Sequence, residues 1–340
     1  MPKYKLTIAI PTYNRPVQLE HTLSVVFPQV VAHENVQLLV IDNASPTPAA
    51  DVLERVTNGS LLPERIRTIR NVANIGGNPN ILRCFELAEG EWLWCLSDDD
   101  EPSSDAVRIV LKDLAEHAEC VYAYYSINDS VPVFGCSDPE TIVVDTIEEW
   151  VSRVPSLGQR LFISASLFRV DACRGSLSLG HAVAPSGGPH LFMAFLAVCG
   201  GGKLFLSQNT IARFVLAPGT WNCVPIVFGM YEIFAFCKSL PMLSAIKSFY
   251  RDGLFFWISP SMFLYQLILQ CEDMSPLWVG KLYGRIGSLF RPPFLSRPKR
   301  YVEYILCRML SYFPWLFLLA VRLRERVAHR TYDKGKSRGI

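Results

Sequence analysis

One stretch in the first third of the chain reads Trp92-Leu93-Trp94-Cys95-Leu96-Ser97-Asp98-Asp99-Asp100-Glu101-Pro102. Its five leading residues are apolar, which is typical of a buried strand, and Pro102 prevents the segment from continuing as an ordinary central strand. Three aspartates therefore follow the strand directly. Because adjacent carboxylates repel one another and are costly to place beside a core, we expect a positive group there, such as Mg²⁺ or Mn²⁺. The triplet alone is also compatible with a solvated acidic loop that caps the next helix.

Strand-like and helix-like segments alternate from residue 5 to residue 126. Besides the strand before the aspartates, apolar runs predict strands at 5–10, 37–41, 66–70 and 121–126. Apolar residues at helical spacing predict helices over 16–27, 49–56, 78–88 and 107–114. This βαβα series predicts an α/β fold, in which a mostly parallel sheet is covered by helices on both faces.

Polar clusters follow several of these strands, where ligands gather in parallel sheets. They are Pro11-Thr12-Tyr13-Asn14-Arg15, Asp42-Asn43 and the aspartates. A fourth cluster at 71–80 includes Gly76-Gly77 at a helix start, where the backbone can approach a ligand and offer free amides. Each cluster alone is also ordinary turn chemistry. The chain has neither GxGxxG nor GxxxxGK[ST], so we expect neither a dinucleotide fingerprint nor a P-loop.

Taken in order, these motifs resemble those of the inverting family 2 glycosyltransferases with a GT-A fold. The resemblance is carried by residues 7–15, 39–45, 74–77 and 96–100. It covers residues 5–126 and continues more weakly to about residue 216. It implies a Rossmann-like GT-A sheet, a nucleotide-sugar donor, Mn²⁺ or Mg²⁺ on the donor diphosphate, and direct displacement at the anomeric carbon.

The resemblance also implies roles for individual positions. The residues that would line the donor site are Pro11, Thr12, Tyr13, Arg15, Asp42, Asn74, Gly76 and Asp98. Asp42 would bind the base or ribose, and Asp98, Asp99 and Asp100 would hold the metal, with Asp100 also a catalytic candidate. Ser97 stands where the family usually has the first residue of Asp-x-Asp-Asp. We therefore expect Asp99 to be the main ligand, whereas a literal DxD motif selects Asp98 and Asp100.

In the family pattern the general base is a carboxylate at the start of a later helix, and this chain departs from that pattern. Here Gly188-Pro189-His190 opens that helix, and no Asp or Glu lies between Arg174 and Val215. We hypothesise that His190 is the base, because a helix N-terminus disfavours the imidazolium form. The alternative is a histidine that only hydrogen-bonds the cap or stacks on the acceptor. His181 is a lesser candidate, and residues 180–188 are expected to form a mobile lid.

The C-terminal region differs from the rest in charge and rhythm. Residues 280–340 hold 14 Lys or Arg and 3 Asp or Glu, although the net charge of the chain is only +2. We predict a glycosyltransferase domain at 1–216 and a helical, basic region at 217–340, with helices at 230–240, 254–271 and 301–326. Ten uncharged residues at 312–321 are too few for a bilayer span, which needs about 20.

The helix at 301–326 is therefore predicted to lie on anionic lipid, and its alternative is a buried helix whose arginines face water. The aliphatic residues between its basic ones do not favour nucleic acid. Fifty per cent of the residues are hydrophobic and the mean hydropathy is +0.21, which agrees with membrane contact. Ten scattered cysteines without a CxxC pair predict reduced thiols, and no signal segment is expected at the start. We expect a bacterial protein, peripheral on the cytoplasmic face of the inner membrane.

Membrane contact suits a lipid-linked saccharide acceptor and surface-polysaccharide synthesis of the O-antigen type. Residues 162–168, followed by Gly188-Pro189-His190, resemble the abequosyltransferase-like subgroup, which implies a deoxysugar donor. Two other interpretations stay open. One is a catalytically silent, nucleotide-sugar-binding scaffold subunit at the membrane, which the missing carboxylate base supports. The other is a nucleotidyl- or phosphotransferase that uses the aspartates with two metals.

Overall fold

The computed structural model describes residues 2–127, 141–154, 161–184 and 188–215, together with Ile305, Met309, Tyr312, Phe313 and Trp315. The residues up to Val215 lie in one compact unit and the five later residues in a second. The helices predicted at 230–240 and 254–271, and most of the one at 301–326, lie outside the described residues. Within the described part of the chain, no helix has the length and apolar character needed to cross a bilayer.

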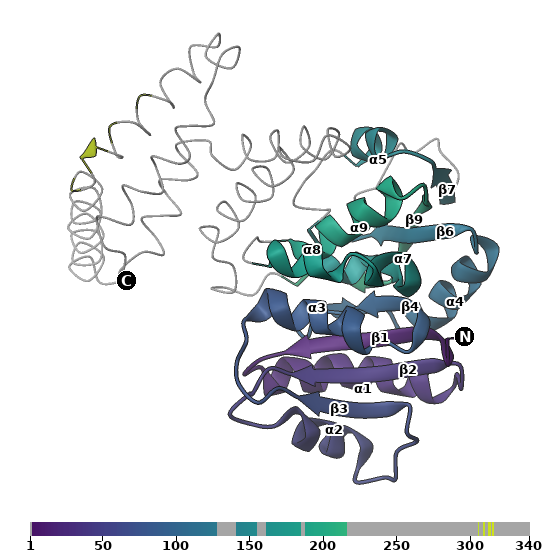
Figure 1. Ribbon diagram of the computed structural model, residues 1–340. Helices are drawn as coiled ribbons and strands as arrows, with labels where there is room; N and C mark the ends of the chain where they lie inside the picture. The colour runs from purple at the N-terminus through teal and green to yellow at the C-terminus, as the bar shows by residue number, and fades with distance from the viewer. Residues whose placement is uncertain are drawn as a thin grey trace, which may run out of the picture. The chain divides into compact units, whose positions relative to one another are not determined.

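The first unit is organised around an eight-stranded sheet with the order β3-β2-β1-β4-β8-β6-β9-β7 (Figure 1). Its strands are β1 Tyr4–Thr12, β2 Val36–Asp42, β3 Ile66–Arg70, β4 Gly90–Cys95, β6 Cys120–Ser126, β7 Thr141–Val144, β8 Ser166–Arg169 and β9 Lys203–Thr210. β3, β2, β1 and β4 are parallel neighbours, as are β6 and β9. β8 runs antiparallel between β4 and β6, and β7 runs antiparallel to β9. The predicted mostly parallel sheet is confirmed, with two antiparallel strands that the βαβα rhythm did not predict.

The helices form two groups, which cover the two faces of the sheet. One group contains α1 Pro16–Val31, α2 Ala49–Thr57 and α4 Ala106–Glu116. The other contains α3 Gly77–Leu87, α5 Ile147–Arg153, α7 Val170–Arg174, α8 Leu177–Ala182 and α9 Pro189–Cys199 (Figure 1). A short 3₁₀ turn, η1 Ile163–Ala165, precedes β8. This arrangement is the helix-covered sheet that the sequence predicts.

Two boundaries differ from the sequence-based expectation. Helix α1 continues through Pro28 to Val31, beyond the predicted end at residue 27. Val26 and Val30 are fully buried on the same side of the helix, so packing of the last turn outweighs the helix-breaking tendency of Pro28. At 180–188 the expected lid is partly wrong, because Gly180 belongs to α8 and is buried, where a Cβ would meet Met193 Sδ at 2.8 Å. Residues 185–187 lie outside the described residues.

A later segment of the chain pairs with the residues that follow the aspartates. Glu101–Pro102 form strand β5, which pairs in an antiparallel ribbon with β10, Ala212–Arg213. Pro102 therefore stands in a short two-stranded ribbon outside the large sheet, in keeping with its missing N–H group. β4 itself ends at Cys95, and Trp92 and Trp94 are fully buried. The aspartates thus follow the best-buried part of the fold.

Candidate active site

The carboxyl ends of β2, β1 and β4 lie side by side, and their polar clusters are bonded to one another. The Asn43 amide donates to the Thr12 carbonyl oxygen at 2.9 Å. The Thr12 hydroxyl donates to Oδ2 of Asp98 at 2.6 Å. Three motifs that are far apart in the sequence therefore meet at one edge of the sheet, which is where an open α/β sheet binds its ligands.

The acidic triplet is held in a tight turn. The Thr22 hydroxyl lies 3.1 Å from the Asp98 carbonyl oxygen and 3.3 Å from that of Asp100, so α1 anchors the turn from one side. On the other side the Ser164 hydroxyl donates to Oδ2 of Asp100 at 2.6 Å and accepts from the Ser97 amide at 2.9 Å. Asp98 and Asp100 are each only 4% exposed. The triplet is thus a buried structural turn and not a solvated loop.

The three carboxylates point in different directions. Asp98 faces Thr12 and Arg15, whose Nη1 lies 3.1 Å from Asp98 Oδ1. Asp99 accepts from the Ser97 hydroxyl at 2.6 Å and from the same Arg15 nitrogen at 2.6 Å. Asp100 faces Ser164. Burial raises the pKa of Asp98, and burial together with the neighbouring carboxylates raises the pKa of Asp100 to about 7.

The donor chemistry of this turn suits Mn²⁺ or Mg²⁺, but its geometry does not present a ready metal site. Among the described residues, no group of three or more His, Cys, Asp or Glu side chains converges on a point that could hold a metal ion. The oxygens of Asp98 and Asp99 are bonded to hydroxyls and to the Arg15 guanidinium. Arg15 is thus a positive group that lies beside the aspartates, and the predicted divalent metal stays a prediction.

Asp42 is an anchor for the loop that follows β2. Its carboxylate accepts from the Ser45 amide at 2.8 Å and the Ala49 amide at 3.2 Å, and it forms an ion pair with Arg70. Burial disfavours its charged form, but these hydrogen bonds outweigh burial and lower its pKa. Asp42 is 1% exposed, whereas the Arg70 side chain is 44% exposed. Asp42 lies in the predicted place, and its predicted contact with base or ribose stays a prediction.

Asn43 is the hub of an amide network that joins β2, β3 and α3. Its Oδ1 accepts from Asn71 Nδ2 and from the Ile75 amide, each at 3.0 Å. Its Nδ2 donates to Asn74 Oδ1 at 2.8 Å and to the Gly76 carbonyl at 3.2 Å. Gly76 has φ +92°, a conformation that favours glycine at the start of α3. Asn74 and Gly76 are thus brought to the site edge, through a residue that the sequence marks only as part of a polar cluster.

The remaining predicted donor residues follow β1. Pro11 is half-buried and lies opposite Ile41 of β2 in the sheet register. Tyr13 is 44% exposed, so its ring is available to a ligand. Asn14 has φ +55°, and its amide donates to the Ser45 hydroxyl at 3.0 Å, which ties this loop to the one after Asp42.

His190 occupies the second residue of α9 and is 4% exposed. Its Nε2 lies 3.1 Å from the Leu161 carbonyl oxygen, an acceptor, so Nε2 carries the proton in the neutral ring. Nδ1 is buried and has no hydrogen-bond partner among the described residues. Burial lowers the pKa of His190 to about 4, so the ring is neutral at pH 7. The base hypothesis requires a neutral ring, but it attributed the neutral form to the helix N-terminus and not to burial. His181 instead pairs with Glu86 of α3 at 2.9 Å.

Three residues of this site were missed by reasoning from the sequence: Thr22, Asn43 and Ser164. Ser164 lies within a resemblance segment and Asn43 within a polar cluster, but neither position carried a role. Thr22 is a polar residue inside a predicted amphipathic helix, and no motif marks it as part of a site. All three are buried polar residues, and a buried polar side chain needs partners that the sequence does not name.

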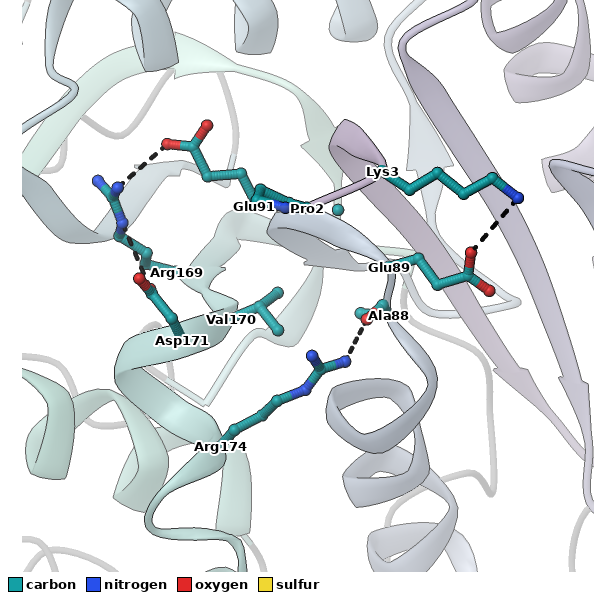
Figure 2. Close-up of a pocket in the computed structure, with 10 residues that line it drawn as sticks. Pro2, Lys3, Ala88, Glu89, Glu91, Arg169, Val170, Asp171 and Arg174 are labelled. Carbon is teal, nitrogen blue, oxygen red and sulfur yellow. Dashed lines mark hydrogen bonds and ion pairs between the residues drawn. The ribbon is translucent and has the colours of Figure 1, made fainter.

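A separate pocket of about 700 Å³ lies at the end of the sheet opposite to the aspartates. Figure 2 shows the residues that line it. It is bordered by the amino-terminal ends of β1 and β4 and by α7. Its charged groups are bonded within the fold: Arg169 to Glu91 at 3.3 Å, Lys3 to Glu89 at 3.9 Å, and Arg174 to carbonyl oxygens at the end of α3. Because these charges are matched locally, the described residues that line the pocket include no unpaired charge that would select a ligand.

Solved structures of glycosyltransferases share this fold. A mannosyltransferase from Pyrobaculum calidifontis in complex with GDP-Man and Mn²⁺ matches with a TM-score of 0.54 at 13% identity, covering 92% of this chain and 88% of its own. TarS 1–349 from S. aureus in complex with UDP-GlcNAc matches with a TM-score of 0.54 at 14% identity, covering 91% of each chain. At such identities the likeness establishes the fold alone.

The sequence also matches a known family over part of its length. Residues 7–153 match the family model described as glycosyl transferase family 2, which is the family that the motifs in this stretch resemble. An abequosyltransferase, RfbV, from Salmonella typhimurium is 29% identical over 114 residues. That alignment spans about a third of each chain, 34% of this one and 34% of the relative.

Proposed function

We propose that the chain is an inverting glycosyltransferase that moves a sugar from a nucleoside-diphosphate donor to a lipid-linked saccharide in surface-polysaccharide synthesis. The observation that carries this proposal is the family match over residues 7–153, which spans all four polar motifs. All four motifs are linked by hydrogen bonds at the carboxyl edge of the sheet. The similarity to an abequosyltransferase supports a deoxysugar donor.

The donor would lie along that edge. The exposed Tyr13 ring and the Asp42–Arg70 pair would meet the nucleoside, and the loop at Asn74 and Gly76 would approach it from β3. Asp98, Asp99 and Asp100 would hold Mn²⁺ or Mg²⁺, which neutralises charge on the departing diphosphate. Two proteins with the same fold, in complex with GDP-Man and with UDP-GlcNAc, support a nucleotide sugar as the donor.

His190 would accept the proton from the acceptor hydroxyl. Its hydrogen bond to the Leu161 carbonyl orients the ring, and its free Nδ1 carries the lone pair that a base needs. We expect His190→Gln to lower turnover at least about 100-fold while nucleotide binding is kept. His181→Gln is the matched control, since His181 pairs with Glu86 on another helix, and it should keep full turnover. Near-normal turnover in His190→Gln would rule this role out.

The second unit supports the acceptor side of the proposal. Ile305, Met309 and Tyr312 are helical, are spaced four and three residues apart, and are 40%, 44% and 65% exposed. Residues at this spacing lie on one side of an α-helix. Phe313 and Trp315 add 50% and 56% exposed aromatic side chains. Together with 14 basic residues at 280–340, this apolar surface supports peripheral binding to an anionic inner leaflet, where a lipid-linked acceptor would be found.

The decisive experiment is a thermal-shift panel of nucleoside diphosphates with the full chain, with and without Mn²⁺. A ligand that binds only the folded state raises the unfolding midpoint. We expect one nucleotide to give a clear, Mn²⁺-enhanced shift, and the corresponding sugar nucleotide then to donate to a lipid-linked acceptor. If no nucleotide shifts the midpoint under either condition, the proposal fails.

A catalytically silent scaffold subunit is the second candidate. It is favoured by the absence of Asp and Glu near the start of α9 and by the low pKa of His190, because a base of low pKa has little driving force for proton transfer. The two candidates separate in a single-turnover experiment with excess protein. Transfer of labelled sugar to a lipid-linked acceptor supports the enzyme, and donor binding without transfer supports the scaffold.

A further inference from the structure

One guanidinium nitrogen bridges two of the predicted metal ligands. Arg15 Nη1 lies 2.6 Å from Asp99 Oδ2 and 3.1 Å from Asp98 Oδ1. The other oxygen of Asp98 accepts from Thr12, and the other oxygen of Asp99 accepts from Ser97. All four oxygens of these two carboxylates therefore have partners inside the protein.

A divalent cation and this arginine compete for the same atoms. Mg²⁺ requires carboxylate oxygens at about 2.0–2.1 Å in near-octahedral geometry, which the hydrogen-bonded arrangement does not offer. A guanidinium at this place also repels a cation of the same sign.

The arginine is free to leave, whereas the aspartates are not. Arg15 precedes α1, its side chain is 31% exposed, and its long stem has many rotamers. The side chains of Asp98 and Asp99 are 5% and 15% exposed, and their turn is anchored through Thr22. A movement that exchanges the counter-ion would therefore be a rotation of Arg15 about its side-chain bonds.

We propose that Arg15 is the resident counter-ion of Asp98 and Asp99, and that it keeps divalent metal out until a nucleoside diphosphate draws it away. The proposal rests on the proposed metal-dependent function. A diphosphate offers the guanidinium new anionic oxygens, and the released carboxylates then offer theirs to Mn²⁺. The metal and the nucleotide thus bind cooperatively, and the coupling resides in Arg15.

The test is direct Mn²⁺ binding to the full chain, followed by the electron paramagnetic resonance signal of free Mn²⁺. Without nucleotide, we expect Arg15→Gln to bind Mn²⁺ at least tenfold more tightly than the wild type. Arg15→Met, which keeps an apolar stem without charge, serves if the glutamine variant does not fold. Arg55→Gln is the control, since Arg55 forms an exposed pair with Glu20 at 2.8 Å, and it should match the wild type.

Addition of UDP, GDP or dTDP completes the test. The nucleotide that binds should tighten Mn²⁺ at least tenfold in the wild type and much less in the Arg15 variants. Equal Mn²⁺ affinity in wild type and variants overturns the role of Arg15 but leaves the metal site standing. If an Arg15 variant still binds Mn²⁺ tightly after Asp99→Asn is added, the metal lies elsewhere, and this result also overturns the proposed role of Arg15. No Mn²⁺ binding by any variant, with or without nucleotide, removes the metal-dependent function itself.

Discussion

At the scale of single residues, buried carboxylates in this domain fall into two kinds. Hydrogen bonds from Ser45 and Ala49 and the pair with Arg70 overcome burial at Asp42 and lower its pKa. Burial dominates at Asp98, Asp100 and Asp113 and raises their pKa values. Folding therefore favours the ionised form of Asp42, whereas ionisation of the other three carboxyl groups lowers the stability of the folded state.

Asp113 on α4 is 4% exposed and lies outside the candidate site, so a substitution there tests this cost without changing the site. Its raised pKa means that the folded state favours its protonated form, and its ionisation lowers stability as pH rises above the ordinary Asp value. We expect Asp113→Asn to equal or exceed the wild type at pH 7 by up to about 1 kcal/mol. Urea unfolding at pH 7 and pH 3.5 measures this, and the gain should vanish at the lower pH. A loss of stability at pH 7 would contradict it.

His190 gives the opposite pH dependence. Its pKa is about 4 in the folded protein, against an ordinary value of 6.5 for a solvated imidazole, so the unfolded chain binds the extra proton first. Stability from the neutral ring is complete above pH 6.5 and falls as pH drops toward 4, by about 3 kcal/mol. His190→Gln should lose this part of the pH dependence. Urea unfolding of both proteins from pH 7 to pH 4 checks it, and parallel curves would mean that folding does not lower the pKa of His190.

At the scale of elements, the start of α3 depends on Asn43. Asn43→Asp would keep the shape but replace the Nδ2 donor with an oxygen, which would face the acceptor oxygens of Asn74 and Gly76. We expect a loss of about 1–3 kcal/mol in the free energy of unfolding and a weaker nucleotide-induced thermal shift. Asn58→Asp, at an exposed helix C-cap with φ +51°, is the control and should change little. Wild-type stability in Asn43→Asp would mean that the network does not hold the loop.

At the scale of the whole molecule, the proposed setting depends on the second unit. Replacing Tyr312 and Trp315 with Ser should lower binding to vesicles that contain anionic phospholipid by at least about tenfold, because aromatic side chains anchor at the interface. Co-sedimentation with vesicles of neutral and anionic composition measures this. Leu61→Ser, which changes a fully exposed apolar residue of the first unit, should bind as the wild type does. Equal binding of all three proteins would show that Tyr312 and Trp315 do not contribute to lipid binding, contrary to the prediction.

The sequence by itself determined the elements and the edge at which chemistry gathers. An apolar run that changes to aspartates after Leu96 marks a buried strand and its polar end, whatever its neighbours are. The same reasoning located Pro11 to Arg15, Asp42 and Gly76, because turn chemistry and periodicity are local properties of the chain. The family motifs added the GT-A fold, which the structural comparisons confirm.

Only the tertiary structure decided which groups neutralise the aspartates. Arg15, Thr12 and Ser164 lie more than sixty residues from their partners in the triplet, and the strand order β1-β4-β8 brings them together. The insertion of antiparallel β8 between β4 and β6 was likewise set by packing. A buried charge must find its partner in space, and no local pattern records which distant segment will supply it.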